Sequence, residues 1–287
     1  MKQLLIISGK GGTGKTTVAS ALIKLSEAKA YADCDVDAPN LHLVGNWESE
    51  PKNSLYYGMS KAEVNMDLCI ECGKCIEHCR FDAISSDPNY EVNQFACEGC
   101  GVCEHVCPVG AISLKPAVAG DLYLYKDVDS VFSTAKLKIG SGNSGKLVTE
   151  VKNQMKESAT VGEIAIIDGS PGIGCPVIAS LSGVDMVLIV AEPSISGLSD
   201  MVRIIDTAKG FGVKIATCIN KYDINMEKTK EIEETCSTYG IPVVGRIPYD
   251  SCAVKAVNDG KTIVDMDCKS GEAVREVYEK VIKSLLE

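Results

Sequence analysis

The residues best suited to chemistry form a glycine-rich stretch near the N-terminus. Gly9–Thr17 reads Gly-Lys-Gly-Gly-Thr-Gly-Lys-Thr-Thr, and its spacing is that of a Walker A phosphate-binding loop. It follows an apolar run at 4–7, which predicts a buried strand, and it precedes residues 18–23, which have helical spacing. Because glycine-rich turns and helix N-termini attract anions, this context predicts a nucleotide phosphate site. The cradle residues are Gly11, Gly12, Thr13, Gly14, Lys15, Thr16 and Thr17.

Two side chains of this loop have specific tasks in the Walker A pattern. The lysine, here Lys15, reaches the β- and γ-phosphates, and the hydroxyl of Thr16 binds Mg²⁺. Asp168 ends another apolar strand at 164–167, which is the Walker B arrangement, in which a carboxylate holds Mg²⁺ through water. We therefore expect Lys15, Thr16 and Asp168 to form one phosphate and metal site.

A later segment concerns the nucleotide base. Asn220-Lys221-Tyr222-Asp223 follows the next-to-last strand of the predicted sheet and should face the base. It also matches the Asn-Lys-x-Asp pattern of guanine-binding proteins. The residues alone therefore leave GTP open beside ATP.

Eight of the fourteen cysteines form two matching runs. Cys69-x2-Cys72-x2-Cys75-x3-Cys79 is followed, 28 residues on, by Cys97-x2-Cys100-x2-Cys103-x3-Cys107-Pro108. Such self-similarity indicates a duplicated supersecondary unit. The spacing is that of bacterial two-cluster ferredoxins, in which the fourth cysteine of each run binds the other cluster.

This rule assigns the cysteines to two interleaved sets of iron ligands. One 4Fe–4S cluster is expected on Cys69, Cys72, Cys75 and Cys107, and the second on Cys97, Cys100, Cys103 and Cys79. The competing interpretation is two zinc sites with four thiolates each, although zinc modules usually pair two Cys-x2-Cys knuckles.

The order of elements along the chain predicts an α/β fold with an insertion. Apolar strands alternate with helical segments before residue 46 and again after residue 160, which indicates a parallel sheet covered on both faces. We expect a P-loop nucleotide-binding domain in two parts, 1–55 and 119–287, around a small α+β ferredoxin-like domain at 56–118. Residues 121–137 are expected to be irregular and extended. A C-terminal helix at 271–286 carries one apolar face, which predicts core packing rather than membrane binding.

Composition limits the partners and the compartment. The net charge of −10 argues against binding to nucleic acid or to an anionic membrane. No signal peptide or transmembrane run is evident in the sequence. Fourteen cysteines without an export signal favour metal ligands in a reducing cytoplasm over disulfides.

The motifs together resemble the MinD/ParA-type ATPases with a deviant Walker A loop, a group that includes the nitrogenase iron protein. The second loop lysine, Lys10, carries this resemblance. It implies that Lys10 reaches the partner's nucleotide across a dimer interface, that Asp35 positions the attacking water, and that the amide of Gly172 meets the γ-phosphate. It also implies ATP, with Asn220, Pro248 and Asp250 near the adenine. The alternatives are a solvated lysine at Lys10 and an ordinary Asp-rich turn around Asp35.

The whole chain resembles the members of this superfamily that carry an inserted two-cluster ferredoxin domain. Three functions follow from the resemblance: an ATP-dependent electron donor to a partner metalloprotein, an ATP-dependent assembly factor or carrier for metal clusters like the Mrp-type proteins, and a regulatory or positioning ATPase with structural clusters. The expected assembly is a homodimer or a heterodimer with a paralogue. Cys175 matches a cluster ligand of the iron protein, but no second cysteine lies near 140–145. We therefore expect Cys175 to be a small buried or interface residue, with a redox or metal-transferring thiol as the alternative.

Overall fold

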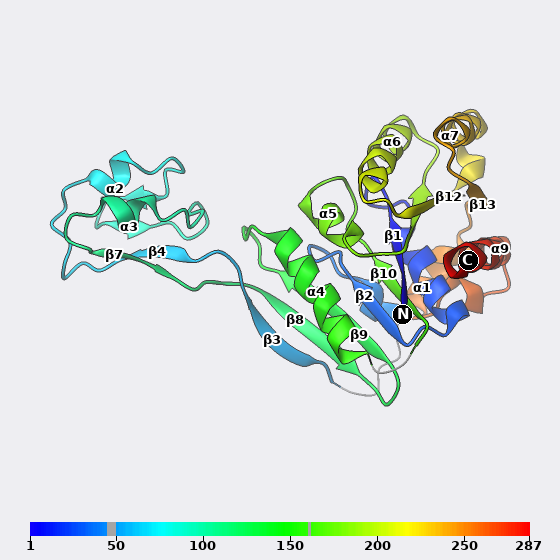
Figure 1. Ribbon diagram of the computed structural model, residues 1–287, viewed down its shortest axis with the longest axis horizontal. Coiled ribbons are helices and arrows are strands. Elements are labelled where there is room, and N and C mark those ends of the chain that lie inside the picture. Colours follow the sequence, from blue (N-terminus) through cyan, green and yellow to red (C-terminus); the bar gives the residue numbers. More distant parts are fainter. Residues whose placement is uncertain (45–49, 160–161) are drawn as a thin grey trace. The chain divides into compact units, whose positions relative to one another are not determined.

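The computed structural model describes residues 1–44, 50–159 and 162–287 (Figure 1). Asn46, where the sequence predicts the first α/β segment to end, lies outside these residues. The chain forms two compact units. The large unit comprises Met1–Asn53, Leu122–Lys136 and Gly145–Glu287, and the small unit comprises Ser54–Asp121 and Leu137–Ser144. No helix in the described ranges is long and apolar enough to cross a membrane.

The large unit is built on a parallel sheet. Its strands pair in the order β13-β12-β11-β1-β10-β2-β9, and every pairing between these neighbours is parallel. The central strands are uninterrupted apolar runs buried on both faces, as a parallel sheet requires. Their bounds are β1 Lys2–Ile7, β2 Ala30–Asp33, β9 Val131–Leu137, β10 Ile164–Asp168, β11 Met186–Ala191, β12 Lys214–Asn220 and β13 Val243–Ile247.

Two further strands, β8 (Val118–Lys126) and β3 (Lys52–Tyr57), continue the sheet beyond β9. The expectation of irregular structure over 121–137 is therefore wrong, because this segment forms most of β8 and all of β9. The reason is the burial of apolar side chains in β9: Phe132 is fully buried and stacks on Tyr31 and Tyr125.

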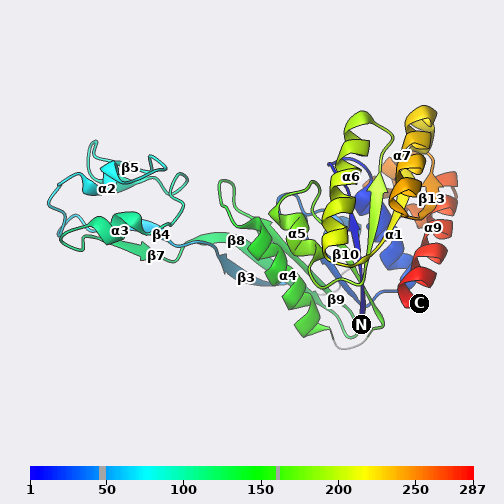
Figure 2. The same cartoon turned by 45° about the horizontal axis from the view of Figure 1, so that its top comes forward.

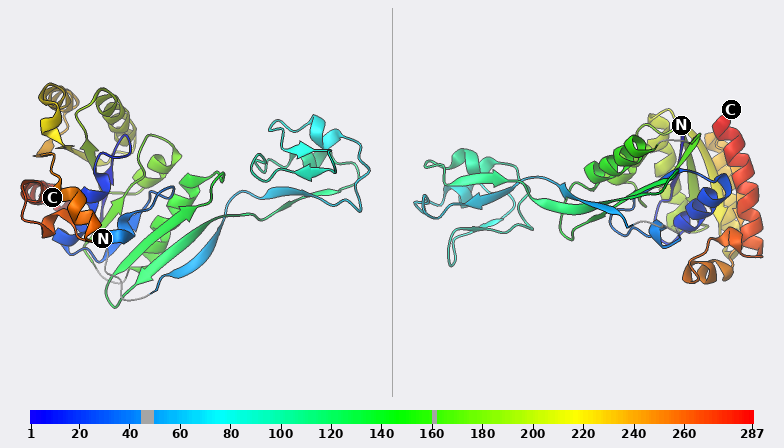
Figure 3. Two further views of the ribbon diagram at one scale, coloured as in Figure 1. Left: turned by 180° about the vertical axis from the view of Figure 1, so that it is seen from behind. Right: turned by 90° about the horizontal axis from the view of Figure 1, so that it is seen from below.

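Helices cover both faces of the sheet in the large unit. Helices α1 and α9 pack on one face, and α4, α5 and α6 lie on the other (Figures 2 and 3). The helix bounds are α1 Lys15–Ser26, α4 Ser144–Ser158, α5 Cys175–Leu181, α6 Ile195–Gly210, α7 Met226–Tyr239, α8 Cys252–Asn258 and α9 Lys269–Leu286. Short 3-10 helices lie at Leu41–Val44, Tyr222–Ile224 and Ile263–Asp265.

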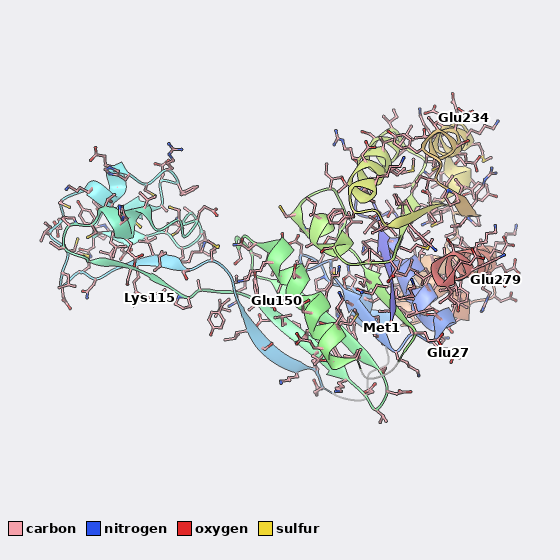
Figure 4. All side chains as sticks on the ribbon, viewed as in Figure 1. Met1, Glu27, Lys115, Glu150, Glu234 and Glu279 are labelled. Carbon is pink, nitrogen blue, oxygen red and sulfur yellow. The ribbon has the colours of Figure 1, made fainter. Side chains whose placement is uncertain are left out.

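The C-terminal helix α9 packs in the core, as its apolar stripe predicts. Val274, Val277, Val281 and Leu285 are buried in the cluster that also contains the α1 side chains. The opposite faces of the surface helices carry acidic groups. Glu150 on α4, Glu234 on α7 and Glu279 on α9 are exposed and project outward (Figure 4).

The small unit has little regular structure. Strand β4 (Lys61–Val64) pairs antiparallel with β7 (Ile112–Lys115), and β5 (Ile84–Ser85) pairs with β6 (Glu91–Val92). Its helices α2 (Lys74–Glu77) and α3 (Val102–Val106) each follow a glycine in the left-handed region. These two glycines, Gly73 and Gly101, occupy equivalent positions in the two cysteine runs, so the sequence repeat is also a structural repeat.

Candidate functional site

The glycine-rich loop connects β1 to α1 and leaves the start of that helix open. Gly14 occupies the N-cap of α1 with φ 89°, a left-handed conformation that favours glycine, and no side chain caps the helix. The first N–H groups of a helix have no partner within it, so an uncapped start offers them to an anion. The hydroxyl of Thr13 is buried here and has no hydrogen-bond partner among the residues that the structure describes. These groups fit a phosphate.

Lys15, Thr16 and Asp168 meet as the sequence predicts. Lys15 Nζ lies 2.5 Å from Asp168 Oδ1, and Thr16 Oγ1 donates to Asp168 Oδ2 at 2.6 Å. Both charged side chains are buried, at 6% and 0% exposure. Burial disfavours the Lys15 ammonium, but Asp168, with smaller contributions from Asp33 and Asp35, offsets this effect and raises the pKa of Lys15. The site therefore keeps a charged lysine away from water.

Asp33 organises the loop that follows β2, a role that sequence reasoning missed. Its carboxylate accepts the N–H groups of Asp35, Asn40 and Leu41 at 2.9–3.0 Å. Burial, with the nearby Asp168 carboxylate, raises the pKa of Asp33 to about 7. The sequence signal that could have identified Asp33 is that it directly follows an apolar strand, as Asp168 does. In the sheet the two residues lie in register, Asp33 on β2 and Asp168 on β10.

Asp35 is half-buried at the start of this loop and lies within the electrostatic reach of the cradle. Burial raises the pKa of Asp35, and the Lys15 ammonium opposes that rise. The Asp35 carboxylate and the Lys15 ammonium thus influence each other electrostatically. The role of Asp35 in orienting water stays a prediction, beside the alternative of an ordinary Asp-rich turn.

The loop after β10 is held in a definite conformation. The N–H of Gly172, which has φ 96°, donates to the carbonyl of Ser8 at 3.0 Å. The hydroxyl of Ser170 donates to the carbonyl of Cys34. The Gly172 amide must leave the Ser8 carbonyl before it can reach a γ-phosphate, so a conformational change is built into its expected role.

Lys10 is bound within its own chain and is not freely solvated. Its Nζ lies 3.0 Å from Glu192 Oε2 and donates to Ser194 Oγ at 3.1 Å. Glu192 also pairs with Lys221 at 3.4 Å, and Lys221 donates to the carbonyl of Gly12 at 2.8 Å. Glu192 and Ser194 follow β11, and the sequence carried no signal that they would face the glycine-rich loop.

A cavity of about 360 Å³ adjoins the cradle, within the size range of ligand pockets. It brings together the residues predicted to lie near the base, Asn220, Pro248 and Asp250. It is also lined by Gly12, Gly14, Thr17, Val18, Lys221, Ile247, Tyr249, Ala253, Val254, Val257, Asn258, Ile263, Ser270 and Val274. We call this space the base cavity.

Two contacts around the base cavity bear on the choice between adenine and guanine. Asn220 Nδ2 donates to the carbonyl of Thr13 at 2.6 Å, so this amide fastens the glycine-rich loop. Asp223, the last residue of the Asn-Lys-x-Asp pattern, accepts the N–H of Tyr249 at 2.7 Å. Among the described residues, Asp223 is not one of those that line the base cavity. This arrangement counts against the guanine alternative.

The eight cysteines of the small unit line two separate hollows. One is bordered by Cys69, Cys72, Cys75 and Cys107, and the other by Cys79, Cys97, Cys100 and Cys103. The fourth cysteine of each run thus lies with the first three cysteines of the other run.

Backbone N–H groups donate to the fourth cysteine of each run, Cys107 and Cys79. Ala111 donates to Cys107 Sγ at 3.2 Å, and Ala83 donates to Cys79 Sγ at 3.4 Å. Although burial acts in the opposite direction, the N–H of Ala111 and those of its neighbours lower the pKa of Cys107. Hydrogen bonds of this kind stabilise a thiolate, the form in which cysteine binds metal.

Cys175 is the first residue of α5 and is exposed. The expectation that it is buried is therefore wrong, and only the interface and reactive-thiol interpretations remain. Gly145 lies directly against it: a Cβ at that glycine would come within 3.2 Å of Cys175 Cβ. Ile173 and Ile178, on either side of Cys175, are 43% and 46% exposed.

Comparison with known proteins places this site in a family. Residues 4–263 match the CobQ/CobB/MinD/ParA nucleotide binding domain. An uncharacterized protein of Methanocaldococcus jannaschii is 35% identical over 283 residues, which cover 97% of this chain and 96% of that protein. The septum site-determining protein MinD of Bacillus subtilis is 23% identical over 292 residues, which cover 99% of this chain and 88% of that protein.

Solved structures show the same fold. MinD of Pyrococcus horikoshii complexed with Mg-ADP aligns with a TM-score of 0.59 and 20% identity, covering 99% of this chain and 96% of that one. A chain of the MinC:MinD cell division protein complex of Aquifex aeolicus gives a TM-score of 0.55 at 20% identity, with the same coverage. The chain therefore belongs to the CobQ/CobB/MinD/ParA nucleotide-binding family and is an ATPase of the MinD/ParA type.

Proposed function

We propose that this protein is an ATP-driven switch whose small unit holds two 4Fe–4S clusters and acts on a partner protein. The observation that carries the proposal is the pairing of a complete phosphate cradle in the large unit with two four-cysteine hollows in the small unit. We assign the nucleotide-binding domain to 1–55 and 119–287, and the ferredoxin-like insertion to 56–118.

In the proposed nucleotide site, the cradle N–H groups bind the phosphates and Lys15 neutralises the β- and γ-oxygens. Thr16 and Asp168 would hold Mg²⁺, which prefers oxygen ligands, and these two side chains already share a hydrogen bond. Asp35 would orient the water that attacks the γ-phosphate. Asn220, Pro248 and Asp250 would surround the adenine. The base cavity has room for it, and its lining supports ATP over GTP.

The proposed switch involves two chains, either a homodimer or a heterodimer with a paralogue. Lys10 must leave Glu192 and Ser194 to reach a neighbouring nucleotide, so ATP would act by offering it a stronger anionic partner. Three exposed isoleucines lie close to these segments in the sequence: Ile173 follows Gly172, Ile178 is on α5 and Ile195 follows Ser194. Apolar side chains around a nucleotide-dependent site are suited to an interface that forms in only one nucleotide state.

The donor atoms of the small unit support two iron–sulfur clusters in this proposal. Four cysteines border each of its two hollows, and four thiolates are the ligand set of a 4Fe–4S cluster. Across residues 1–44, 50–159 and 162–287, no three His, Cys, Asp or Glu side chains are grouped to hold a metal ion. When bound, a 4Fe–4S cluster supplies one-electron redox chemistry.

Two candidate functions of the proposed ATP-driven switch each have specific support. Eight thiols in two complete quartets favour an ATP-dependent electron donor to a partner metalloprotein. The comparisons favour the second candidate, a regulatory or positioning ATPase in which the clusters are structural, because the named relatives are septum site-determining proteins. The cluster-carrier alternative has weaker support, since Gly145 and not a cysteine faces Cys175.

A redox titration in two nucleotide states tests the proposal and separates its two outputs. Anaerobic protein is titrated with ADP and with a non-hydrolysable ATP analogue, and iron release to a chelator is followed in parallel. For an electron donor, a coupling of about 1–3 kcal/mol between the sites would shift the midpoint potential by roughly 40–130 mV. Lys15→Ala should show no shift. Equal potentials and equal chelation rates in both states would reject the electron donor in favour of the regulatory ATPase.

A further inference from the structure

A cavity separate from the base cavity lies beside the loop that follows β2. It is lined by residues of the segment 37–42, by Pro51 and by residues of β8 and β9, all of which belong to the large unit. Its volume of about 380 Å³ is within the size range of ligand pockets. Open α/β sheets bind ligands outside the carboxyl ends of their strands, and β2 ends where this loop begins. We call this space the β9 cavity.

The hydroxyl of Thr134 indicates that the β9 cavity takes a ligand. Thr134 lies on β9 in register with Asp33 of β2, and it is 3% exposed. Its Oγ1 atom is buried and has no hydrogen-bond partner within residues 1–44, 50–159 and 162–287. A buried polar group without a partner is unfavourable, and this one borders a cavity. A polar ligand atom in the β9 cavity would supply the missing hydrogen bond.

The other polar groups of the β9 cavity are mostly hydrogen-bond donors. Among the described residues, the Lys136 ammonium takes part in no ion pair. The ring of His42 and the side-chain amide of Asn40 can donate as well. Asp37, which is exposed, is the one carboxylate in the described part of the lining. An excess of donors over carboxylates favours an anionic ligand.

Tyr123 and Tyr125 supply an aromatic surface in the same cavity. They are two residues apart on β8, so they lie on one face of that strand. Both are half-buried, and the ring of Tyr125 stacks on Phe132 with the ring centroids 5.3 Å apart. This stacking holds the Tyr125 ring in place. A fixed aromatic ring beside a cavity is suited to a flat apolar group.

We propose that the β9 cavity binds a small organic anion with a planar apolar body, of the class of aromatic carboxylates. Thr134 and Lys136 lie on the same face of β9, so one carboxylate can accept the Thr134 hydroxyl and pair with the Lys136 ammonium. The ring of the ligand rests on the two tyrosines. The site and its chemistry are independent of the roles proposed for the nucleotide and for the iron–sulfur clusters.

Asn40 connects the β9 cavity to the loop that carries Asp35. Asn40 lines the cavity, and its backbone N–H donates to the Asp33 carboxylate at 2.9 Å. Asp33 also accepts the N–H of Asp35 at 3.0 Å. A ligand held against Asn40 therefore stabilises the loop in the conformation in which Asp33 binds it.

Ligand-observed NMR titration of the whole nucleotide-free protein tests the site. Benzoate is the probe, and benzamide is its neutral counterpart of nearly the same shape. We expect benzoate to bind about tenfold more tightly than benzamide, because only benzoate pairs with Lys136. No binding of benzoate, or equal binding of the two probes, would overturn the proposal.

Two substitutions locate the bound probe. Thr134→Val keeps the side-chain shape and Lys136→Met changes an exposed residue, so both variants should fold, and each should bind benzoate about tenfold more weakly. The matched controls are Thr217→Val, at a fully buried threonine of β12, and Lys138→Met, at another exposed lysine. Both controls should bind benzoate as wild type does. Unchanged affinity in Thr134→Val and Lys136→Met would place the probe elsewhere and overturn the proposal.

Hydrogen exchange measures the expected effect on the loop. Saturating benzoate should slow amide exchange in residues 35–41 severalfold, and it should have no such effect in Lys136→Met. Unchanged exchange in wild-type protein with benzoate bound would overturn the link between the cavity and the loop. Neither experiment uses ATP or iron, so a failure of the proposed function, seen as unimpaired ATP binding by Lys15→Ala or as absent iron, is distinguishable from a failure here.

Discussion

The two units are stabilised by different kinds of core. The large unit buries a continuous cluster of aliphatic side chains from the sheet, α1 and α9. The buried cluster of the small unit contains Ala62, Ala83, Ile84 and Ile112, and its other members are Cys75, Cys97 and Cys103. Where the large unit has leucine, isoleucine and valine, the small unit has thiols.

The contents of the two cores predict which unit can fold by apolar burial alone. Small domains bury too little apolar surface to offset chain entropy, and they commonly depend on disulfides or metals. The small unit has helices of one turn and strands of two to four residues within its own sheets. We therefore expect its fold to depend on ligation of the cysteines, while the large unit folds without nucleotide.

Matched substitutions of buried cysteines give the largest expected effect. Cys103→Ala should remove about half of the iron and the amide protection of residues 61–115, because it takes one ligand from a quartet. Cys218→Ala removes a fully buried thiol from the large unit and should cost only about 1 kcal/mol of unfolding free energy. Hydrogen exchange by mass spectrometry measures both. Equal, modest effects of the two substitutions would show that the two cores do not differ.

Lys15→Ala tests the ionic centre of the large unit. It should weaken ATP binding by about a hundredfold or more and lower the unfolding free energy by about 3 kcal/mol, because it leaves the buried Asp168 carboxylate without its partner. Lys24→Ala, on the exposed side of α1, should change neither property. Calorimetric titration and thermal unfolding give both numbers. Near-wild-type ATP binding by Lys15→Ala would remove the phosphate cradle from this account.

Asp35→Asn tests the proposed water-positioning carboxylate. Hydrolysis should slow by about 100-fold while ATP binding stays within a few-fold, since the contribution is made only to the reaction. Asp37→Asn, on an exposed side chain of the same loop, is the matched control and should hydrolyse ATP normally. Steady-state ATPase assays distinguish them. If both variants hydrolyse at the wild-type rate, the loop is an ordinary acidic turn.

Lys10→Ala and Glu192→Gln should have opposite effects on assembly. Removal of Lys10 should abolish ATP-dependent dimerisation with nucleotide affinity within a few-fold. Loss of the Glu192 charge should release Lys10 and increase the dimer fraction at low ATP analogue concentration. Sedimentation velocity measures the dimer fraction. A normal dimer in Lys10→Ala would refute a role across the interface.

The smallest expected effect concerns Lys152, which is buried on α4 and donates to the carbonyls of Ala179, Ser180 and Ser182. Burial lowers the pKa of Lys152 from 10.5 to about 8. Between these values the unfolded chain binds more protons than the folded chain, so the unfolding free energy rises with pH, by about 1–3 kcal/mol in total.

Denaturant titrations of wild type and Lys152→Met from pH 7.5 to 10.5 check this expectation. The rise should be absent from the variant, and the difference between the two proteins should change only in this window. A parallel pH dependence in both proteins would show that Lys152 does not titrate there.

Much of the large unit could be predicted from periodicity and motif spacing. The strand Met186–Ala191 and the helix Met226–Tyr239 lie in the region after residue 160 where alternating strands and helices are predicted, because long apolar or amphipathic runs dominate the local choice. The burial of the apolar face of α9 and the proximity of Lys15 to Asp168 were also predictable. Each depends on a pattern within one segment or on a motif with a fixed geometry.

The features that were missed depend on contacts between distant segments. Asp33 holds three N–H groups only because its loop turns back over it, and Lys10 pairs with Glu192 only because β1 and β11 are neighbours. The extent of β8 and β9 was missed because polar residues interrupt their sequence, while pairing in the sheet extends the strands. Partners of this kind are set by tertiary structure and leave no local pattern.

The metal content of anaerobically purified protein tests directly whether the small unit holds two 4Fe–4S clusters. Iron and acid-labile sulfide are measured per chain, together with zinc and the EPR spectrum of the reduced protein. The proposed ligand sets predict roughly eight irons and eight sulfides per chain, with signals of reduced 4Fe–4S clusters that disappear when the cysteine quartets are broken. Stoichiometric zinc without iron, or a small unit whose amides are fully protected without any metal, would show that the cysteines do not hold 4Fe–4S clusters.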